Sequence, residues 1–152
     1  MAKKKINSRA KGARAERECR NKLRWVFRQM FGDAIPEDFW SRGQQFSGIG
    51  DSPDVCIHPR YRSTLAGDIV SKLLHIENKW VERLNLREAM AQAEKDAGGK
   101  IPVVTHKKSQ KPWLLTMNLE DLPALYQMLR TLERILKEEE KPSDCVQPTE
   151  GA

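Results

Sequence analysis

The sequence has few of the features that mark secreted or membrane proteins. It contains three cysteines, Cys19, Cys56 and Cys145, and no C-x-x-C pair. An odd number of widely spaced cysteines argues against a disulfide framework and favours a reducing, cytoplasmic setting. No apolar run reaches transmembrane length, and the basic start Met1–Lys5 lacks the apolar stretch of a signal peptide. We therefore expect an intracellular protein with no membrane partner.

Acidic residues are scarce in the first thirty residues. That segment contains eleven Lys or Arg residues against two acids, a local balance of +9 within a formal net charge of +6. From Glu133 onward the ratio reverses, with six acids against three bases. A strongly basic amino-terminal end predicts binding of a polyanion, of which nucleic acid is the usual example.

Hydrophobic periodicity predicts one α/β domain over residues 8–140, between a basic arm at 1–7 and a disordered tail at 141–152. We read residues 59–72 as a hairpin-like excursion because they contain Pro59 and Gly67. The predicted helices cover residues 8–31, 85–97 and 118–140, and the predicted strands cover residues 38–42, 54–58, 73–80, 101–105 and 113–117.

The strand at 73–80 carries charge that an ordinary core strand would avoid. Period-two alternation places Glu77 and Lys79 on one face, roughly 7 Å apart along the strand. With Asp54 on a neighbouring strand, these side chains would form a compact site for a divalent cation and a phosphate. The alternative is a surface pair on the sheet, worth under about 1 kcal/mol. On the same reasoning His58 and His75 are expected at the strand surface.

A second unusual charge lies in the first helix. Its apolar stripe consists of Cys19, Leu23, Val26, Phe27 and Met30. Glu16 falls at the edge of this stripe, whereas Glu18 projects almost opposite it, toward water. A carboxylate facing the sheet needs a positive partner. Periodicity leaves two possibilities open, a functional site or a salt bridge to Arg20 or another base.

Three separated segments resemble the PD-(D/E)XK nuclease superfamily, and within it the archaeal-type Holliday junction resolvases and related phage nucleases. Lys11–Glu18 is similar to their first-helix K-G-x-x-x-E-R-E signature, and Pro53–Val55 with Ile76–Lys79 matches the name-giving motif. Residues 98–104, followed by Trp113–Leu115, resemble the late strands. The resemblance implies a restriction-endonuclease-like three-layer fold with a mixed central sheet flanked by helices (α-βββ-α-ββ-α), and it favours the functional interpretation of Glu16.

The resemblance also implies a metal-dependent DNA endonuclease acting on branched or Holliday-junction DNA. Its catalytic residues would be Glu16, Asp54, Glu77 and Lys79. Mg²⁺, with Mn²⁺ as a substitute, would bind Asp54, Glu77, the backbone carbonyl of Asn78 and, directly or through water, Glu16. No small-molecule cofactor is expected. Two alternatives remain, a phage or mobile-element nuclease acting on ordinary duplex DNA and a non-catalytic DNA-binding protein with the same fold.

DNA and a second copy of the chain are the expected partners. The residues expected to contact DNA are Lys11, Arg14, Arg17, Arg42, Lys107, Lys108 and Lys111. Leucines at 122, 125, 129, 132 and 136 form a seam on the last helix, for which Asn118 is the expected N-cap. This seam suits a homodimer that cuts two strands, or packing within one chain.

Overall fold

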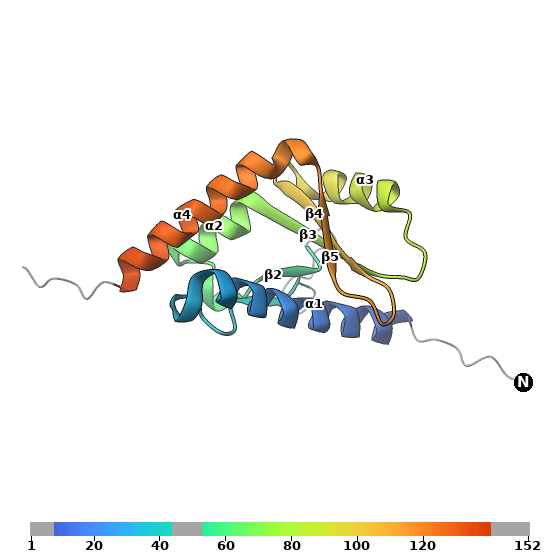
Figure 1. The fold of residues 1–152 in the computed structure, drawn as a ribbon, viewed down its shortest axis with the longest axis horizontal. Helices are drawn as coiled ribbons and strands as arrows, with labels where there is room; N and C mark the ends of the chain where they lie inside the picture. Colours follow the sequence, from blue (N-terminus) through green and yellow to red (C-terminus); the bar gives the residue numbers. More distant parts are fainter. Residues whose placement is uncertain (1–7, 44–52, 141–152) are drawn as a thin grey trace, which may run out of the picture.

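The computed structural model describes residues 8–43 and 53–140 (Figure 1). The predicted basic arm, most of the glycine-containing loop before Pro53 and the predicted tail lie outside the described residues. None of the described helices combines the length and apolar character needed to cross a bilayer.

Five strands form one mixed sheet, which confirms the predicted α/β class. They lie in the spatial order β1-β2-β3-β4-β5, with β3 and β4 parallel and the other neighbours antiparallel. A parallel pair needs a crossover connection, and α3 supplies it between β3 and β4. The strands are β1 (Trp40–Arg42), β2 (Val55–Ile57), β3 (Leu74–Trp80), β4 (Ile101–Lys107) and β5 (Leu114–Met117).

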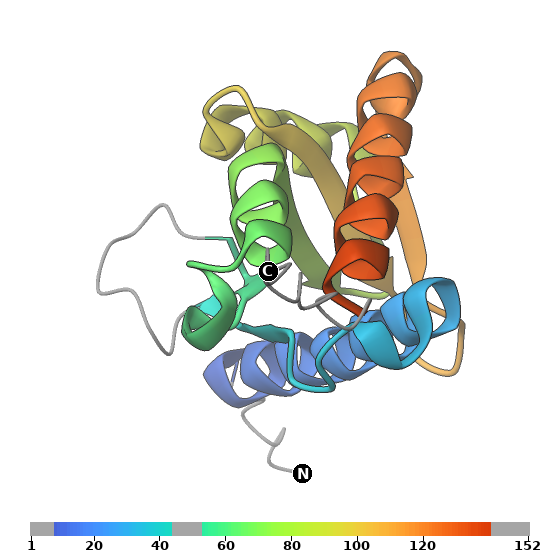
Figure 2. The ribbon, with the colours of Figure 1, turned by 90° about the vertical axis from the view of Figure 1, so that its left-hand side faces the viewer.

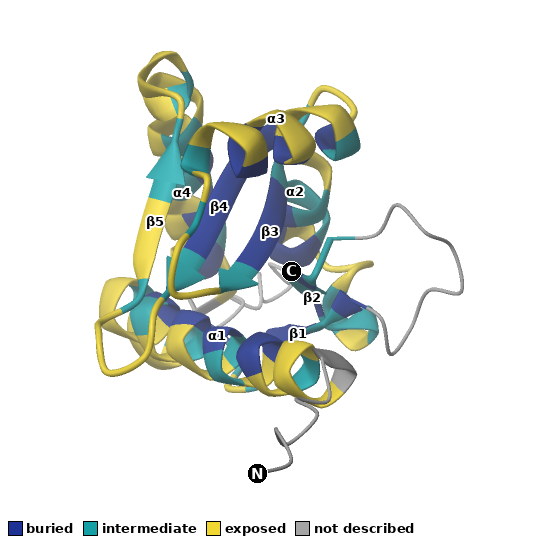
Figure 3. Cartoon of the chain, turned by 90° about the vertical axis from the view of Figure 1, so that its right-hand side faces the viewer, coloured by how far each residue is buried: buried dark blue, intermediate teal, exposed yellow. Residues whose placement is uncertain are grey.

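Helices cover both faces of this sheet. Helix α3 (Leu86–Ala97) lies on one face, where Ala89, Met90 and Ala93 pack against Val104 of β4. The main core lies on the other face, under α2 (Leu65–Leu73) and α4 (Leu122–Glu140) (Figure 2). Helix α1 (Ser8–Phe31) crosses the end of the sheet toward which β3 and β4 run (Figure 3). That end is where the charged residues of β3 meet the first helix.

Helix α2 was not predicted, and the expected hairpin-like excursion over residues 59–72 is wrong. The helix begins after Thr64, whose hydroxyl oxygen accepts a hydrogen bond from the backbone N–H of Gly67 at 3.1 Å. The same hydroxyl donates to the Tyr61 carbonyl at 2.6 Å. A side chain at Gly67 would collide with that carbonyl. Glycine is therefore needed at position 67 because the Tyr61 backbone lies close to it at the start of the helix. It does not mark a turn.

The leucine seam of α4 is used within the chain. Leu132 and Leu136 are buried in the main core with Met128, whereas Leu122 is half exposed. Asn118 is the N-cap of a 3₁₀ turn at Leu119–Asp121 that leads into α4, and not of α4 itself; its side chain makes no capping hydrogen bond and donates to Glu94 instead.

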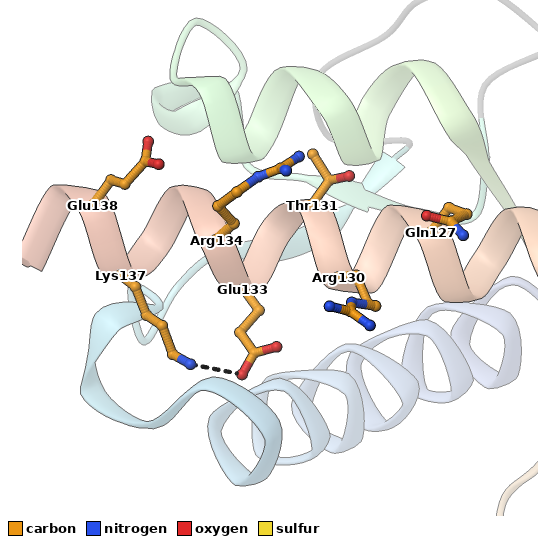
Figure 4. A pocket seen from close by; sticks show the side chains of 7 residues that line it. All are labelled: Gln127, Arg130, Thr131, Glu133, Arg134, Lys137 and Glu138. Atoms are coloured by element: carbon orange, nitrogen blue, oxygen red, sulfur yellow. Dashed lines mark ion pairs between the residues drawn. The ribbon is translucent and has the colours of Figure 1, made fainter.

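The outward side of α4 is polar. It borders a hollow of about 490 Å³ in which Lys137 and Glu133 form an ion pair at 3.0 Å (Figure 4). None of the four predicted catalytic side chains lines this hollow.

Candidate functional site

Asp54 lies where β2 separates from β3. The two strands pair at Val55 and Ile76, and the backbone N–H of Asp54 donates to the Ile76 carbonyl at 3.1 Å. The Asp54 carboxylate then accepts a hydrogen bond from the backbone N–H of Asn78 at 2.9 Å. The side chain thus takes the place of a backbone partner in the ladder. This contact holds one carboxylate oxygen against the β3 backbone, beside Glu77 and Lys79.

The predicted catalytic side chains share one electrostatic environment. The pKa of Asp54 is raised from 3.8 to about 6, mainly by burial and also by the negative charges of Glu77 and Glu16, whereas the Asn78 N–H and the Lys79 ammonium act in the opposite direction. Residues from α1, β3 and the start of β2 therefore act on one carboxyl group. A cation among these three acids would offset the part of this rise that comes from the charges of Glu77 and Glu16.

Glu16 is buried on α1 and forms the salt bridge that the sequence left open as an alternative to a functional role, with Arg42 as the partner and not Arg20. Its Oε2 lies 3.0 Å from Nε of Arg42 on β1, and the two side chains are 10% and 14% exposed. Arg42 stands opposite Val55 in the sheet, next to Asp54. The guanidinium therefore supplies positive charge at the edge of the acidic group. This internal pairing leaves Arg42 less available to contact DNA than was expected from the sequence.

Glu77 is buried and lies against His75 on the same face of β3. Oε1 of Glu77 is 3.0 Å from Nε2 of His75, which is 2% exposed. The expected surface position of His75 is wrong, because α3 covers this face of the sheet. Among the described residues, the His, Cys, Asp and Glu side chains whose ligand atoms all lie within 4.8 Å of one another are His75, Glu77 and Asp96. Asp54 and Glu16 are not part of that tighter group.

Asn78 and Lys79 complete the charged end of β3. Oδ1 of Asn78 accepts a hydrogen bond from the Thr105 hydroxyl at 2.9 Å, and its Nδ2 is buried without a partner in the described part of the chain. No described carboxylate lies within 4 Å of the Lys79 ammonium. The amine of Lys79 is thus available to a ligand. The role of the Asn78 carbonyl as a metal ligand stays a prediction.

Glu18 does not project into water as expected. It forms an ion pair with Lys107 at the end of β4 and accepts a hydrogen bond from the indole of Trp113 at 3.3 Å. The Lys107 hydrogen bond lowers the pKa of Glu18. The Lys107 ammonium also lies 4.8 Å from the ring centre of Trp80. Lys107 is therefore tied to the protein, and its expected contact with DNA competes with these interactions.

The remaining predicted DNA contacts are exposed and form a basic rim, which comprises Lys11, Arg14, Arg17, Lys108 and Lys111. Helix α1 and the end of β4 are joined beside it by the ion pair of Glu18 with Lys107. Hydrogen bonds to Ser109 lower the pKa of Glu82, and the positive charges of Lys11 and Lys108 lower it further. Arg14 lies 5.4 Å above the ring of Trp80, the last residue of β3. The rim is thus adjacent to the strand that carries Glu77 and Lys79.

Sequence reasoning missed two contacts of the predicted site. Arg42 is the partner of Glu16, and Asp96 is the neighbour of Glu77. In both pairs the two residues lie on different elements of the fold. Asp96 falls beside the sheet-facing Ala93 and Ala97 of α3, and this helical spacing could have placed it near β3. No comparable local signal exists for Arg42.

No family model, no curated protein and no solved structure matches this chain. The likeness to the PD-(D/E)XK nucleases therefore rests on the sequence motifs alone.

Proposed function

We propose that this chain is a metal-dependent DNA endonuclease with its catalytic site at the end of β3. One observation carries the proposal. The half-buried carboxyl of Asp54 lies within the electrostatic influence of Glu16 on α1 and of Glu77 and Lys79 on β3, so that three acids and one amine act on one another. A protein that only binds DNA gains nothing from acids beside the phosphates, because they repel the ligand. Acids beside a basic rim are what phosphodiester hydrolysis through a bound cation requires.

The donor set fits a hydrated Mg²⁺ ion. Asp54 and Glu77 would hold it with the Asn78 carbonyl, and Glu16 would contact it directly or through a water molecule. Mg²⁺ keeps several waters in protein sites, which suits a group of acids more open than the 4.8 Å cluster around His75. When bound, such an ion supplies an activated water and neutralises charge on the phosphate.

Lys79 and Arg42 would act on the substrate side of the site. The Lys79 ammonium would bind the scissile phosphate or orient the attacking water. Arg42 balances the charge of Glu16 at 3.0 Å, and a cation bound by the acids would compete for that carboxylate. The basic rim would hold the phosphate backbone on either side of the reacting bond, without reading its sequence.

We assign the sheet and its helices to the restriction-endonuclease-like fold, with α2 inserted between the second and third strands. Branched or junction DNA is the proposed substrate class, through the resemblance to the junction resolvases. Ordinary duplex DNA is the alternative substrate. The two are separated by the same experiment that tests the activity.

The test is cleavage of labelled duplex, single-stranded, flap and four-way-junction DNA by the full chain in Mg²⁺, Mn²⁺ or EDTA. We expect cleavage in both metals, none in EDTA, and the highest rate on the junction. Asp54→Asn and Glu77→Gln should each lower the rate by at least about a hundredfold, because a metal ligand is lost. DNA binding by both variants should persist, since removal of an acid weakens repulsion of the backbone.

Glu37→Gln is the matched control, because Glu37 is an exposed acid. It should cleave at the wild-type rate. Unchanged cleavage by Asp54→Asn would reject the assigned site. A chain that binds DNA but cleaves none of the four substrates in either metal would favour the non-catalytic alternative.

A further inference from the structure

A second group of ligand-type side chains lies on the face of the sheet covered by α3. His75 and Glu77 project from β3 two residues apart, and Asp96 reaches them from the last turn of α3. The sequence-based site includes Glu77 alone. His75 and Glu77 are buried and Asp96 is half buried, so the group lies between the helix and the sheet.

Two carboxyl groups lie close together in this group. A carboxylate oxygen of Asp96 is within 4.8 Å of one of Glu77, where α3 covers the sheet. Two carboxylates so close repel each other unless they share a proton or a cation. The described residue in contact with Glu77 that can carry positive charge is His75. The imidazole can neutralise one carboxylate as a cation, or serve as a neutral ligand beside both.

The surrounding structure holds these side chains in place. Gln92, one turn before Asp96 on α3, donates from its side-chain amide to Oδ2 of Asp96 at 2.8 Å. The start of α3 is fixed by Asn85, whose side chain accepts from the backbone N–H of Glu88 at 3.2 Å. Supporting hydrogen bonds of this kind orient metal-binding carboxylates in proteins. The β3 backbone is fixed in turn by its seven-residue pairing with β4.

The distances and ligand types suit a transition metal. Nε2 of His75 and Oε1 of Glu77 are 3.0 Å apart. Two adjacent ligands on an ion with bonds of about 2.1 Å are separated by about 3.0–3.4 Å. The ligand atom of Asp96 lies within 4.8 Å of both. One imidazole and two carboxylates suit Zn²⁺ or related ions, whereas Mg²⁺ prefers oxygen ligands alone.

We propose that His75, Glu77 and Asp96 form a binding site for a divalent transition-metal ion, of which Zn²⁺ is the reference member. Three protein ligands leave at least one coordination position open to water. Glu77 would then be shared by this site and the Mg²⁺ site on its other side. The binding site does not depend on the nuclease function; only this sharing rests on that proposed function.

The experiment is titration of the metal-free full chain with Zn²⁺ by calorimetry, and with Co²⁺ by visible absorption, which reports nitrogen and oxygen ligation. We expect one Zn²⁺ bound per chain. His75→Gln and Asp96→Asn should each weaken binding by at least about tenfold. Asp96 is half exposed, so Asp96→Asn keeps the test valid if His75→Gln fails to fold.

Two controls match these variants. Glu88→Gln removes an exposed acid from the same helix, and His106→Gln removes a histidine of β4 that contacts Thr116 at 2.8 Å. Both controls should bind Zn²⁺ as the wild type does. Zn²⁺ affinity that is unchanged in Asp96→Asn, or binding lost equally in His106→Gln, would overturn the proposal.

Cleavage by the wild-type chain in Mg²⁺ alone separates this proposal from the nuclease function. Zn²⁺ binding that requires Asp96, in a chain that never cleaves DNA, would leave the metal site standing and reject the nuclease. Suppose instead that cleavage requires Asp54, but that the Zn²⁺ affinity is unchanged in His75→Gln and Asp96→Asn. The nuclease proposal would then stand, and the metal site would be rejected.

Discussion

Asp54 links the stability of the fold to the chemistry proposed for it. Its pKa is raised from 3.8 to about 6 by burial and by the charges of Glu77 and Glu16. The folded chain therefore binds this proton more tightly than the unfolded chain does. The stability that this group contributes is complete below about pH 3.8 and is lost as the pH rises through about 6. Above that pH the metal-free protein holds an ionised, poorly solvated carboxylate.

We expect Asp54→Asn to raise the free energy of unfolding at pH 8 by about 1–3 kcal/mol, because the amide removes the buried charge. The amide oxygen can still accept the hydrogen bond from the Asn78 N–H. The gain should shrink as the pH falls below about 6, where the wild-type carboxyl is protonated. Urea denaturation in EDTA at pH 5 and pH 8 measures both values.

Glu37→Gln is the control for this measurement as well, because an exposed acid should change the free energy of unfolding little at either pH. A lower stability of Asp54→Asn at pH 8 would contradict the expectation. It would mean that the ionised carboxylate of Asp54 stabilises the metal-free fold, so that no cation is needed to compensate its charge.

The sequence predicted best those positions that depend on periodicity within one strand or one helix. The spacing of Glu77 and Lys79 on one strand follows from the period of two. The inward position of Glu16 follows from the apolar stripe of one helix. The contacts of Glu16 with Arg42 and of Glu77 with Asp96 could not be predicted this way, because they depend on how separate elements pack.

At the scale of elements, the sequence predicted helices α1 and α3 but missed α2. The observed α1 has the predicted bounds, and α3 lies within the predicted range 85–97; its N-cap is Asn85 and it ends at Gly98, which has a φ of 57°. Helix α2 was missed because it is short and contains Gly67, a residue that weakens helices in general. Only the folded backbone shows that this glycine stands against the Tyr61 carbonyl.

Gly67→Ala and Gly12→Ala should therefore change stability in opposite directions. The added methyl group at Gly67 would collide with the Tyr61 carbonyl, so we expect a loss of more than about 2 kcal/mol. Gly12 lies in α1, and a methyl group added there would meet no atom within 4 Å. Alanine at this position should add about 0.5–1 kcal/mol through helix propensity. Chemical denaturation of both variants measures the difference.

Thr64→Ala probes the same helix start independently. It removes the cap of α2 and should cost about 1 kcal/mol, whereas Thr64→Ser should cost little because the hydroxyl is retained. Equal stability of Gly67→Ala and Gly12→Ala would contradict the close approach at Tyr61. Equal stability of Thr64→Ala and Thr64→Ser would contradict the cap.

At the scale of the whole molecule, composition predicted the charge asymmetry but not which charges are free to act. Lys107 and Arg42 are both basic, yet the fold uses them to balance Glu18 and Glu16. The sequence also could not decide whether the leucines of α4 pack within the chain or against a second copy. The structure buries Leu132 and Leu136 within the chain. The expected homodimer therefore needs another surface, and it stays a prediction that sedimentation of the full chain can test.

The exposed bases of α1 should supply a measurable share of DNA affinity. Replacing Lys11, Arg14 and Arg17 together with glutamine should weaken DNA binding and reduce the slope of log K against log salt by up to about 2.7, since each phosphate contact contributes about 0.9. Electrophoretic or fluorescence titrations over a range of salt concentrations measure both quantities.

A matched triple variant separates local contacts from net charge. Arg130, Arg134 and Lys137 are exposed on α4 and line the hollow that contains none of the predicted catalytic residues (Figure 4). Glutamine at these three positions removes the same formal charge as the α1 variant. Because these bases are remote from the rim, they should leave the slope nearly unchanged, and the affinity should fall only slightly through the lower net charge. Equal losses in the two triple variants would mean that DNA responds to the charge of the whole molecule, and the assignment of the basic rim would then be wrong.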